Sequence, residues 1–467
     1  MRVRLFGQYV HISIAVLAAI EFLLFFGSML LAYTVRYETW AAGGVFTSGT
    51  KLWVCALVFA TSNLVSVLAF GLYSSRQRAR TSGVFVRLVA AIGAASVVTA
   101  AVFFTVLDLW IGRGVLVVSS FFALIGAGLS RGLFGRIMDE SLFKRRVLVY
   151  GVGQRTSAIS QLRRRSDRRG FEIVGFIQPD GESVAVPADR ILDASAGILE
   201  LCARLDVHEV VVAMEDRRRG FPILGLLECR LAGVEVTELL TFLERETGRV
   251  RIDVLNPSWM IFGDGFRRDP LRLFSSRVLD LAASAVLVTL SLPVMLLTML
   301  AIKLEDGWRS PIFYGQARVG LGGQTFTVLK FRSMRTDAER DGQAQWAQKS
   351  DPRVTRVGAV IRKLRIDELP QILNVLTGHM SFVGPRPERP QFVAELAQKI
   401  PYYVQRHCVK PGITGWAQLC YPYGSSEQDA LEKLQYDLYY IKNNTLLFDL
   451  AILVQTAEVV FMGKGAR

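Results

Sequence analysis

Four long apolar runs near the start of the chain restrict its fold more than any other feature of the sequence. They are Ile12–Val35, Leu52–Tyr73, Leu88–Leu107 and Val115–Ser130. The first three have the length of about 20 residues that a helix needs to cross a bilayer, and the fourth reaches it only with its flanking residues. Because backbone groups cannot stay unpaired in lipid, the runs predict a four-helix transmembrane region over residues 1–140.

Basic residues indicate which loops of this bundle face the cytoplasm. They cluster before the first run, between the second and third runs, and after the fourth: Arg2, Arg4, Arg76, Arg78, Arg80, Arg87, Arg131, Arg136, Lys144, Arg145 and Arg146. The positive-inside rule predicts a multi-pass membrane protein with both ends of the bundle in the cytoplasm. These loops and their contact with anionic lipid explain the net charge of +14. No DNA- or RNA-binding motif is present, so we expect no nucleic-acid partner.

Two sets of polar residues have plain structural interpretations. Glu21 lies in the middle of the first apolar run. It is either a contact within a pathway or a bonded or protonated residue that faces the bundle, and we favour the second interpretation. The five cysteines form no CxxC pair and the four histidines show no zinc spacing. We therefore expect reduced cysteines and no zinc site.

Residues 141–250 alternate between strand and helix patterns. The expected strands are Val147–Tyr150, Phe171–Ile177, Glu209–Met214 and Val234–Thr237. This alternation predicts a parallel, doubly wound sheet in a Rossmann-like cytosolic domain. A linker rich in Arg, Gly and Pro is expected to follow over residues 251–277.

A short glycine motif follows the first strand of this domain. Gly151-Val152-Gly153 begins like a dinucleotide fingerprint, but Thr156 stands where the third glycine belongs. Asp180 is a poor match for the acid that binds a ribose. A nucleotide site and a tight turn without a ligand both stay open, and we favour the turn. The chain also lacks the Tyr-x-x-x-Lys pair of short-chain reductases.

A fifth apolar run, Leu281–Ile302, opens the expected α/β catalytic domain, residues 278–467. It has the length of a membrane helix, but Pro293 lies in its middle and basic residues flank both of its ends. A crossing helix would place one basic cluster outside the cell. We therefore predict a re-entrant membrane helix over residues 281–302, broken at Pro293. A true crossing with the proline as a tolerated kink is the alternative.

An acid pair, Asp367-Glu368, lies in the most basic part of this domain. Residues 351–389 contain seven Lys or Arg and four Asp or Glu. The pair could simply be a dipole partner of the next helix, Gln371–Leu376. Nearby cations favour a functional role and should depress the pKa of both acids: Arg362, Lys363, Arg365 and Arg386. Lys330 and Arg332 are two residues apart on a strand, which suits either a phosphate clamp or a solvated edge.

Residues 278–467 closely resemble the bacterial polyprenyl-phosphate hexose-1-phosphate transferases, also called monotopic phosphoglycosyl transferases. The whole chain is similar to the large members that begin exopolysaccharide or O-antigen synthesis. The motifs that carry the resemblance are Lys330–Met334, Asp351-Pro352-Arg353, Asp367–Gln371, Asn374–Leu376, Met380–Pro387, Lys410–Gln418 and the terminal Gly-Ala-Arg.

The resemblance implies a two-step reaction through a covalent aspartyl phosphosugar intermediate, on the cytoplasmic face of the bacterial inner membrane. Asp367 would attack the β-phosphate of a UDP-sugar and release UMP, and undecaprenyl phosphate would then accept the sugar phosphate. Glu368 would bind Mg²⁺. The phosphate-binding residues would be Lys330, Arg332, Arg353, Arg365 and Arg386. Many members carry Ser-Pro at the helix break, where this chain has Leu292-Pro293 with Ser291 one place earlier.

Two other function classes stay open at this point. A membrane-associated glycosyltransferase could use the same nucleotide sugar, although the chain has no Asp-x-Asp metal motif. A non-catalytic membrane scaffold or regulator would tolerate the loss of Asp367. The expected partners are a UDP-sugar, undecaprenyl phosphate and the bilayer, and a homo-oligomer is also open. The resemblance favours glucose or galactose as the sugar, and the residues themselves do not name it.

Overall fold

The computed structural model divides the chain into two compact units, Met1–Gly248 and Arg249–Arg467, and each is described by itself. The structure describes residues 2–5, 8–38, 49–73, 81–106, 109, 111–137, 144–160, 162, 170–195, 197–218, 220–255, 257–262, 269–336, 353–421, 424 and 426–461. The Asp351-Pro352 and terminal Gly-Ala-Arg motifs lie outside these residues.

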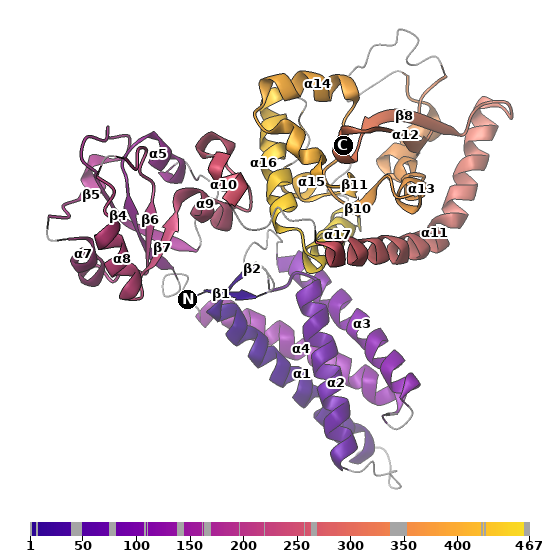
Figure 1. Cartoon of the computed structure of the whole chain (residues 1–467). Coiled ribbons are helices and arrows are strands. Elements are labelled where there is room, and N and C mark those ends of the chain that lie inside the picture. The colour runs from indigo at the N-terminus through magenta and orange to yellow at the C-terminus, as the bar shows by residue number, and fades with distance from the viewer. Residues whose placement is uncertain are drawn as a thin grey trace. The chain divides into compact units, whose positions relative to one another are not determined.

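The first unit begins with a bundle of four apolar helices (Figure 1). These are α1 Ile12–Glu38, α2 Gly49–Ala69, α3 Thr81–Thr105 and α4 Arg113–Ile137, and a short hairpin, β1 Arg2–Leu5 with β2 Gln8–His11, precedes them. Neighbouring helices pack together, and α1 also packs on α4. The predicted helices are confirmed, and all four are long and apolar enough to cross a membrane.

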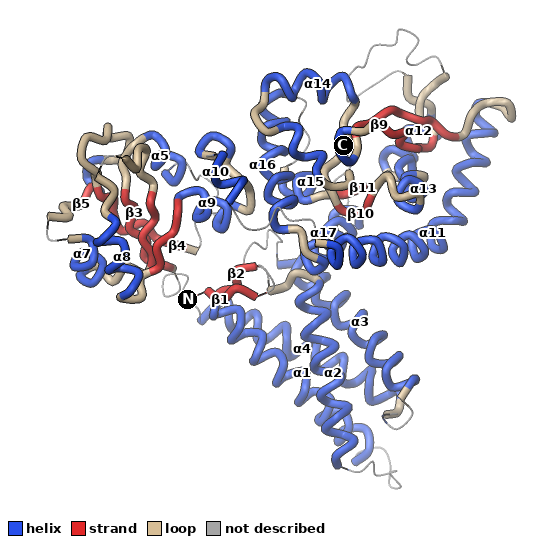
Figure 2. Tube along the Cα trace, viewed as in Figure 1, coloured by secondary structure: helices blue, strands red, loops and turns tan. Residues whose placement is uncertain are grey.

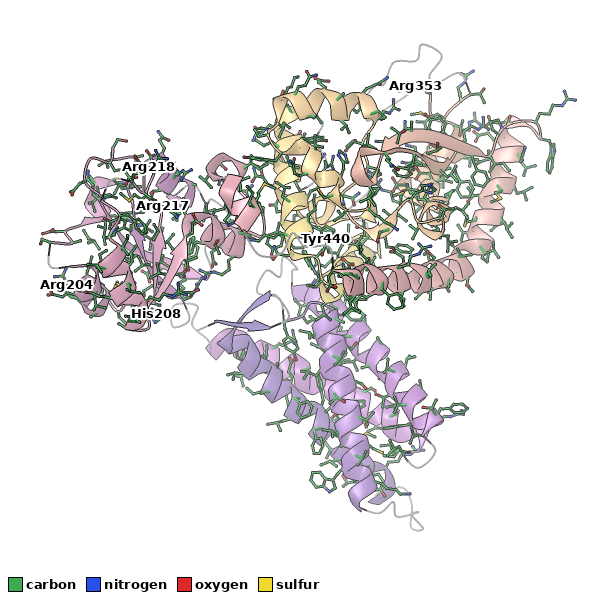
Figure 3. All side chains as sticks on the ribbon, viewed as in Figure 1. Arg204, His208, Arg217, Arg218, Arg353 and Tyr440 are labelled. Carbon is green, nitrogen blue, oxygen red and sulfur yellow. The ribbon has the colours of Figure 1, made fainter. Side chains whose placement is uncertain are left out.

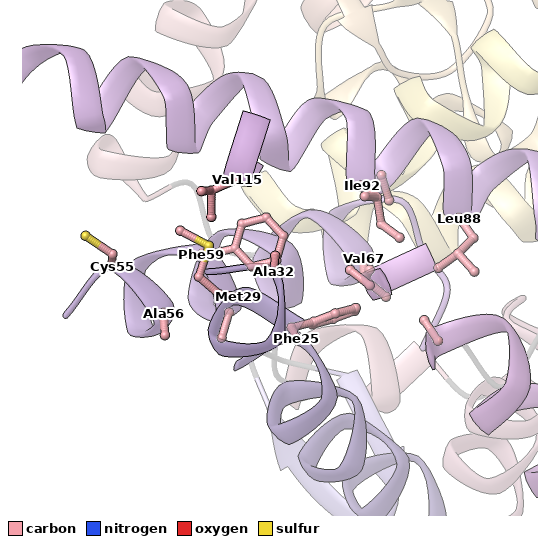
Figure 4. Close-up of a cluster of buried hydrophobic side chains, with 14 of the residues drawn as sticks. Phe25, Met29, Ala32, Cys55, Ala56, Phe59, Val67, Leu88, Ile92 and Val115 are labelled. Atoms are coloured by element: carbon pink, nitrogen blue, oxygen red, sulfur yellow. The ribbon is translucent and has the colours of Figure 1, made fainter. Parts of the chain in front are cut away.

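The interior of the bundle is filled by both large and small apolar side chains (Figure 4). Phe25 and Met29 of α1 lie beside Phe59 of α2, and small residues such as Ala32 and Ala56 let the helices approach closely. Lipid tails are as apolar as these side chains, so close packing rather than burial from water holds such helices together.

Glu21 is buried within the bundle, and both of its carboxylate oxygens have a partner. Its carboxylate forms an ion pair with Arg131 of α4 (Oε1 to Nε, 2.6 Å) and accepts a hydrogen bond from the Tyr73 hydroxyl at 2.5 Å. Arg131 also donates to the carbonyl oxygen of Leu72 at 3.1 Å. The interpretation of Glu21 as a bonded residue that faces the bundle is confirmed.

Replacing Arg131 with methionine is expected to destabilise the bundle by about 3–5 kcal/mol, because the Glu21 carboxylate would stay buried without its counter-ion. The measurement is unfolding in detergent micelles. The double variant Glu21→Leu with Arg131→Met is the control and should regain most of the lost stability, since it removes both charges. A loss below about 0.5 kcal/mol in the single variant would contradict the prediction.

The rest of the first unit is built on one parallel sheet (Figure 2). Its strands are β3 Arg145–Tyr150, β4 Phe171–Ile177, β5 Ile191–Leu192, β6 Glu209–Val212 and β7 Glu235–Glu238, in the order β5-β4-β3-β6-β7. The helical elements between and after them are α5 Gln154–Ser160, η2 Ala188–Arg190, α7 Ile198–Arg204, α8 Ile223–Leu231 and α9 Leu239–Thr247. The predicted parallel pairing is confirmed.

Glutamate side chains accept hydrogen bonds from the backbone amides around the glycine motif in this sheet. The Val152 N–H donates to Glu182 at 2.9 Å, and the Gln154 N–H donates to Glu215 at 2.6 Å. A Cβ on Gly153 would lie 2.5 Å from the Glu215 carboxylate oxygen. The amides that would hold a nucleotide phosphate already have acidic partners, which favours the interpretation as a turn without a ligand.

The second unit is mostly helical, with two small two-stranded sheets. Antiparallel β8 Phe313–Val319 and β9 Thr325–Phe331 form one, and parallel β10 Ser381–Val383 and β11 Gly412–Thr414 form the other. The helical elements are η3 Ile252–Val254, α10 Pro257–Phe262, α11 Pro270–Asp306, η4 Leu321–Gly323, α12 Arg356–Lys363, η5 Ile366–Glu368, α13 Gln371–Leu376, α14 Pro390–Lys399, η6 Tyr403–Cys408, α15 Trp416–Cys420, α16 Glu427–Asn443 and α17 Leu446–Phe461.

Helix α11 differs from the sequence expectation at its start and at its centre. The Asp269 side chain caps it and Pro270 takes its first turn, so it begins inside the segment that was expected to be an irregular linker. Elements η3 and α10 also lie in that segment. The expected break at Pro293 is instead an internal proline in one continuous helix. Figure 1 shows a sharp bend along α11, which the missing hydrogen bond of a proline explains.

Polar side chains near the start of α11 fix it to the rest of the second unit. Arg277 donates to the carbonyl oxygens of Val375 and Leu376 at the end of α13, both at 2.7 Å. The buried Asp280 carboxylate accepts from the Ser381 hydroxyl at 2.8 Å and from the Phe382 N–H at 2.9 Å. The apolar helix is thereby joined to α13 and β10, which both follow the acid pair in sequence.

Candidate active site

The acid pair lies on η5, a single turn between α12 and α13. Arg365, immediately before it, has a left-handed backbone (φ 59°), which turns the chain out of α12. Such a conformation costs a non-glycine residue roughly 1–2 kcal/mol, so the surrounding contacts must hold it. Pro370 then precedes α13 with helical angles. The two acids are therefore presented on a short, sharply defined turn.

Glu368 is the centre of a cluster of cations. Its Oε1 atom lies 3.0 Å from Arg386 Nη2, 3.3 Å from Lys330 Nζ and 3.7 Å from Arg365 Nη1. Burial alone would raise the pKa of Glu368, but the charges of Arg386 and Lys330 hold this pKa far below its usual range. Glu368 is therefore ionised at neutral pH, as the sequence indicated.

Asp367 has the opposite electrostatic environment. Burial raises its pKa, and the negative charge of Glu368 raises it further, while Lys330, Arg365 and Arg362 offset this only in part. The expectation that cations depress the pKa of both acids is therefore wrong for Asp367. Its Oδ1 atom is buried without a hydrogen-bond partner among the residues that the structure describes. A desolvated carboxylate oxygen that accepts no hydrogen bond keeps its lone pairs free to attack phosphorus.

Lys330 and Arg332 do not act as a pair in the structure. Burial lowers the pKa of Lys330, and its ammonium group lies against Glu368. Arg332 instead forms an ion pair with Asp306 at the end of α11, at 2.7 Å. Strand β9 ends at Phe331, so the alternation that would have placed both cations on one face does not continue.

The structure places Arg353 at the entry to α12, outside the cation cluster on Glu368. Its carbonyl oxygen accepts a hydrogen bond from the Arg335 N–H, beside the bridge between Met334 and Val354. Figure 3 labels its side chain on this loop. A role for Arg353 in phosphate binding stays a prediction.

Arg318 and Arg406 also belong to this region, although they were not predicted from the sequence. Arg318 on β8 donates to the carbonyl oxygen of Pro387 at 3.1 Å, and Arg406 on η6 donates to that of Arg386 at 3.0 Å. Both arginines are remote in sequence from the acid pair. The only signal was that Arg318 is preceded, at strand spacing, by another polar residue, Gln316.

The carboxylates of the acid pair are side chains of the kind that bind Mg²⁺, but they do not form a complete metal site by themselves. Within the described ranges, no three His, Cys, Asp or Glu side chains gather in a way that could hold a metal ion. Mg²⁺ is nevertheless commonly held by one or two carboxylates, with water and substrate phosphates completing its shell. Asp367 and Glu368 are adjacent, and the Asp367 Oδ1 atom is unpartnered. Two carboxylates of this kind fit Mg²⁺ once a phosphate is bound.

Comparison with known proteins identifies the family of this part of the chain. Residues 271–463, which include the acid pair and its cations, match the family described as bacterial sugar transferase. The UDP-glucose:undecaprenyl-phosphate glucose-1-phosphate transferase of Xanthomonas campestris pv. campestris is 30% identical over 99% of this chain and 96% of its own length. This chain belongs to the bacterial sugar transferase family.

Other family members show the same pattern of similarity. A protein of the same printed name from Escherichia coli is 32% identical over 71% of each chain. The UDP-N-acetylgalactosamine-undecaprenyl-phosphate N-acetylgalactosaminephosphotransferase of Aeromonas hydrophila is 44% identical over 52% of this chain. The match spans 56% of the Aeromonas protein, a little over half its length. These sugar transferases differ in the sugar that they name.

Proposed function

We propose that the protein transfers a hexose-1-phosphate from a UDP-sugar to undecaprenyl phosphate and releases UMP. The observation that carries the proposal is the difference between the surroundings of the two acids. Asp367 has an unpartnered oxygen, whereas Glu368 holds three cations. The printed activities of the relatives from Xanthomonas and Escherichia support the same two substrates. The product would begin an exopolysaccharide or lipopolysaccharide chain.

The proposed reaction consists of two successive displacements at the β-phosphorus. An Asp367 carboxylate oxygen attacks the β-phosphorus of the UDP-sugar, and the bond to the bridging oxygen breaks, so UMP leaves with that electron pair. A phosphate oxygen of undecaprenyl phosphate then attacks the same phosphorus and releases the Asp367 carboxylate. Lys330, Arg365 and Arg386 neutralise the phosphate oxygens during both steps, which is the main work of a protein in phosphoryl transfer.

Magnesium has a defined place in this proposal. Glu368, with Asp367 beside it, would hold Mg²⁺ together with the diphosphate of the substrate. The ion would spread negative charge from the phosphate oxygens and improve UMP as a leaving group. The protein's own part is to keep Glu368 ionised and to hold its cations in place.

The membrane segments give the reaction its location. We propose that α11, bent at Pro293, re-enters the cytoplasmic leaflet of the bacterial inner membrane, so that the acid pair meets the head group of the lipid acceptor. Large apolar side chains cover the exposed sides of α11, including Leu273, Phe274, Leu290 and Leu297. Both of its ends carry basic residues, which favours entry and return on one side. We further propose that the parallel sheet of the first unit is a Rossmann-like cytosolic domain.

The released nucleotide separates this function from its alternatives. The purified full chain is incubated in detergent with undecaprenyl phosphate, Mg²⁺ and UDP-glucose, UDP-galactose or UDP-N-acetylgalactosamine. The expected products are UMP and a lipid diphosphosugar with one of these donors. Release of UDP would instead indicate a glycosyltransferase, and no turnover with any donor would indicate a scaffold or regulator.

The raised pKa of Asp367 predicts a pH dependence with a definite sign. Attack requires the ionised carboxylate, so kcat/KM should fall as the pH drops through a value above 3.8, the ordinary pKa of an aspartate. Lys330→Met should move this acid limb to higher pH, because Lys330 lowers the pKa of Asp367. Lys399→Met, at an exposed ion pair with Glu395, is the control and should leave the limb in place. An acid limb at or below 3.8 would contradict the assignment.

A further inference from the structure

The segment Pro385–Glu388, here called the arginine loop, is held in an unusual way. Each of its four successive carbonyl oxygens accepts a hydrogen bond from outside the loop. Pro385 accepts from the Gly412 N–H at 2.9 Å and Glu388 accepts from the Val319 N–H at 3.0 Å. The two carbonyls between them accept from side chains, namely Arg406 for Arg386 and Arg318 for Pro387. Backbone groups of irregular loops more often bond to water. In this loop, four successive hydrogen bonds from other parts of the protein hold the backbone in place.

Arg406 is itself fixed before it reaches the loop. It is buried on η6, and its Nη2 atom is shared between the Arg386 carbonyl and Asp437 of α16, 2.8 Å away. Its Nη1 atom donates to the Tyr403 hydroxyl at 2.8 Å. Burial raises the pKa of Asp437 to about 6 even though Arg406 pulls it down. A buried ion pair of this kind is costly to form, which indicates that it does more than add stability.

Arg318 approaches the same loop from β8 on a separate element. Its Nε and Nη2 atoms donate to the Gln316 side-chain oxygen at 3.1 and 2.6 Å, and its Nη1 atom reaches Pro387 and the Glu388 carboxylate. Two arginines from different parts of the fold thus bond adjacent carbonyls. One of these two carbonyls belongs to Arg386, whose side chain donates to Glu368 at 3.0 Å.

We propose that Arg406, held by Asp437, and Arg318 are positioning residues that aim the Arg386 guanidinium at the acid pair. The inference rests on the proposed function, because it assigns Arg386 to the substrate phosphates. Prolines at 385 and 387 already restrict the loop, and the two arginines remove the remaining freedom at its centre. A guanidinium held in place before the substrate arrives stabilises phosphate charge without reorganisation at the moment of reaction.

A double-mutant cycle tests this proposal. It compares Arg406→Met in the natural chain and in an Arg386→Met background, with kcat/KM for UMP release as the readout. The donor is the UDP-sugar that supports turnover with undecaprenyl phosphate. If Arg406 acts through Arg386, its replacement should lower kcat/KM at least about tenfold in the natural chain and less than about threefold where Arg386 is already absent. A purely structural defect would lower kcat/KM equally in both backgrounds and would overturn the proposal.

Arg318→Met keeps the test decisive if Arg406→Met does not fold. Arg318 is partly exposed, and its loss leaves the Arg406–Asp437 pair intact. Arg318→Met should likewise lower kcat/KM in the natural chain and have a much smaller effect in the Arg386→Met background. Arg249→Met is the matched control, since it removes an ion pair to Glu432 on α16 and should act equally in both backgrounds.

The failure of this inference is distinguishable from failure of the proposed function. Normal turnover in Arg386→Met would overturn the assignment of Arg386 to phosphate binding, and with it the inference. A strong effect of Arg386→Met, combined with equal effects of Arg406→Met and Arg318→Met in both backgrounds, would overturn the positioning role alone.

Discussion

Replacing Asp367 with asparagine is expected to lower turnover by roughly four orders of magnitude or more, because an amide is a far poorer nucleophile than a carboxylate. The two side chains have the same shape, and the Asp367 Oδ1 atom has no hydrogen-bond partner within the described part of the chain. The substitution therefore breaks no contact of that atom, and it removes a partly desolvated charge. Folding should be unaffected while the chemistry is lost.

Intact-protein mass spectrometry gives a second readout of the same variant. With a UDP-sugar and no lipid acceptor, the natural chain should gain the mass of one hexose phosphate, and Asp367→Asn should gain none. Asp253→Asn is the control, because Asp253 pairs with Arg251 away from the acid pair and its loss should leave both readouts unchanged. An adduct on the asparagine variant would show that another residue attacks.

Long apolar and strand patterns were predictable because local sequence decides them. The four N-terminal helices and the strand Phe171–Ile177 agree with the prediction. Strand β5 was missed because it is only two residues long, and its pairing with β4 comes from tertiary contact. The start of α11 was not predicted, although Asp269 and Pro270 are an ordinary helix start. The Arg, Gly and Pro residues of this segment favoured an irregular linker instead.

The site was predictable in its residue types and not in its electrostatics. Adjacent acids among arginines pointed to Asp367 and Glu368, but the pKa of Asp367 depends on burial, which a sequence does not state. The family resemblance assigned Arg332 to phosphate binding, whereas strand alternation also allowed a solvated edge. In the structure Arg332 pairs with Asp306, just past the end of the strand. Arg318 and Arg406 reach the arginine loop only through the fold, so the strand spacing of Arg318 from Gln316 was too weak a signal to place either of them there.

Replacing Glu368 with glutamine is the second variant with a large expected effect, a loss of about two to three orders of magnitude in kcat. The amide keeps the shape and one acceptor oxygen but removes the charge that gathers Lys330, Arg365 and Arg386. These cations would then repel one another. Burial already lowers the pKa of Lys330, and without Glu368 this pKa should fall further, so less of the lysine would be protonated.

Titration with Mg²⁺ separates the two roles proposed for Glu368. If it holds the ion, the Mg²⁺ concentration for half-maximal turnover should rise in Glu368→Gln, because a neutral amide is a weaker ligand than a carboxylate. If it only gathers the cations, kcat should fall while this Mg²⁺ concentration stays unchanged. Glu432→Gln, which loses an ion pair with Arg249, is the control for a charge removed elsewhere in the same unit. Normal kcat in Glu368→Gln would contradict both roles, since the cation cluster would then assemble on the substrate without the carboxylate.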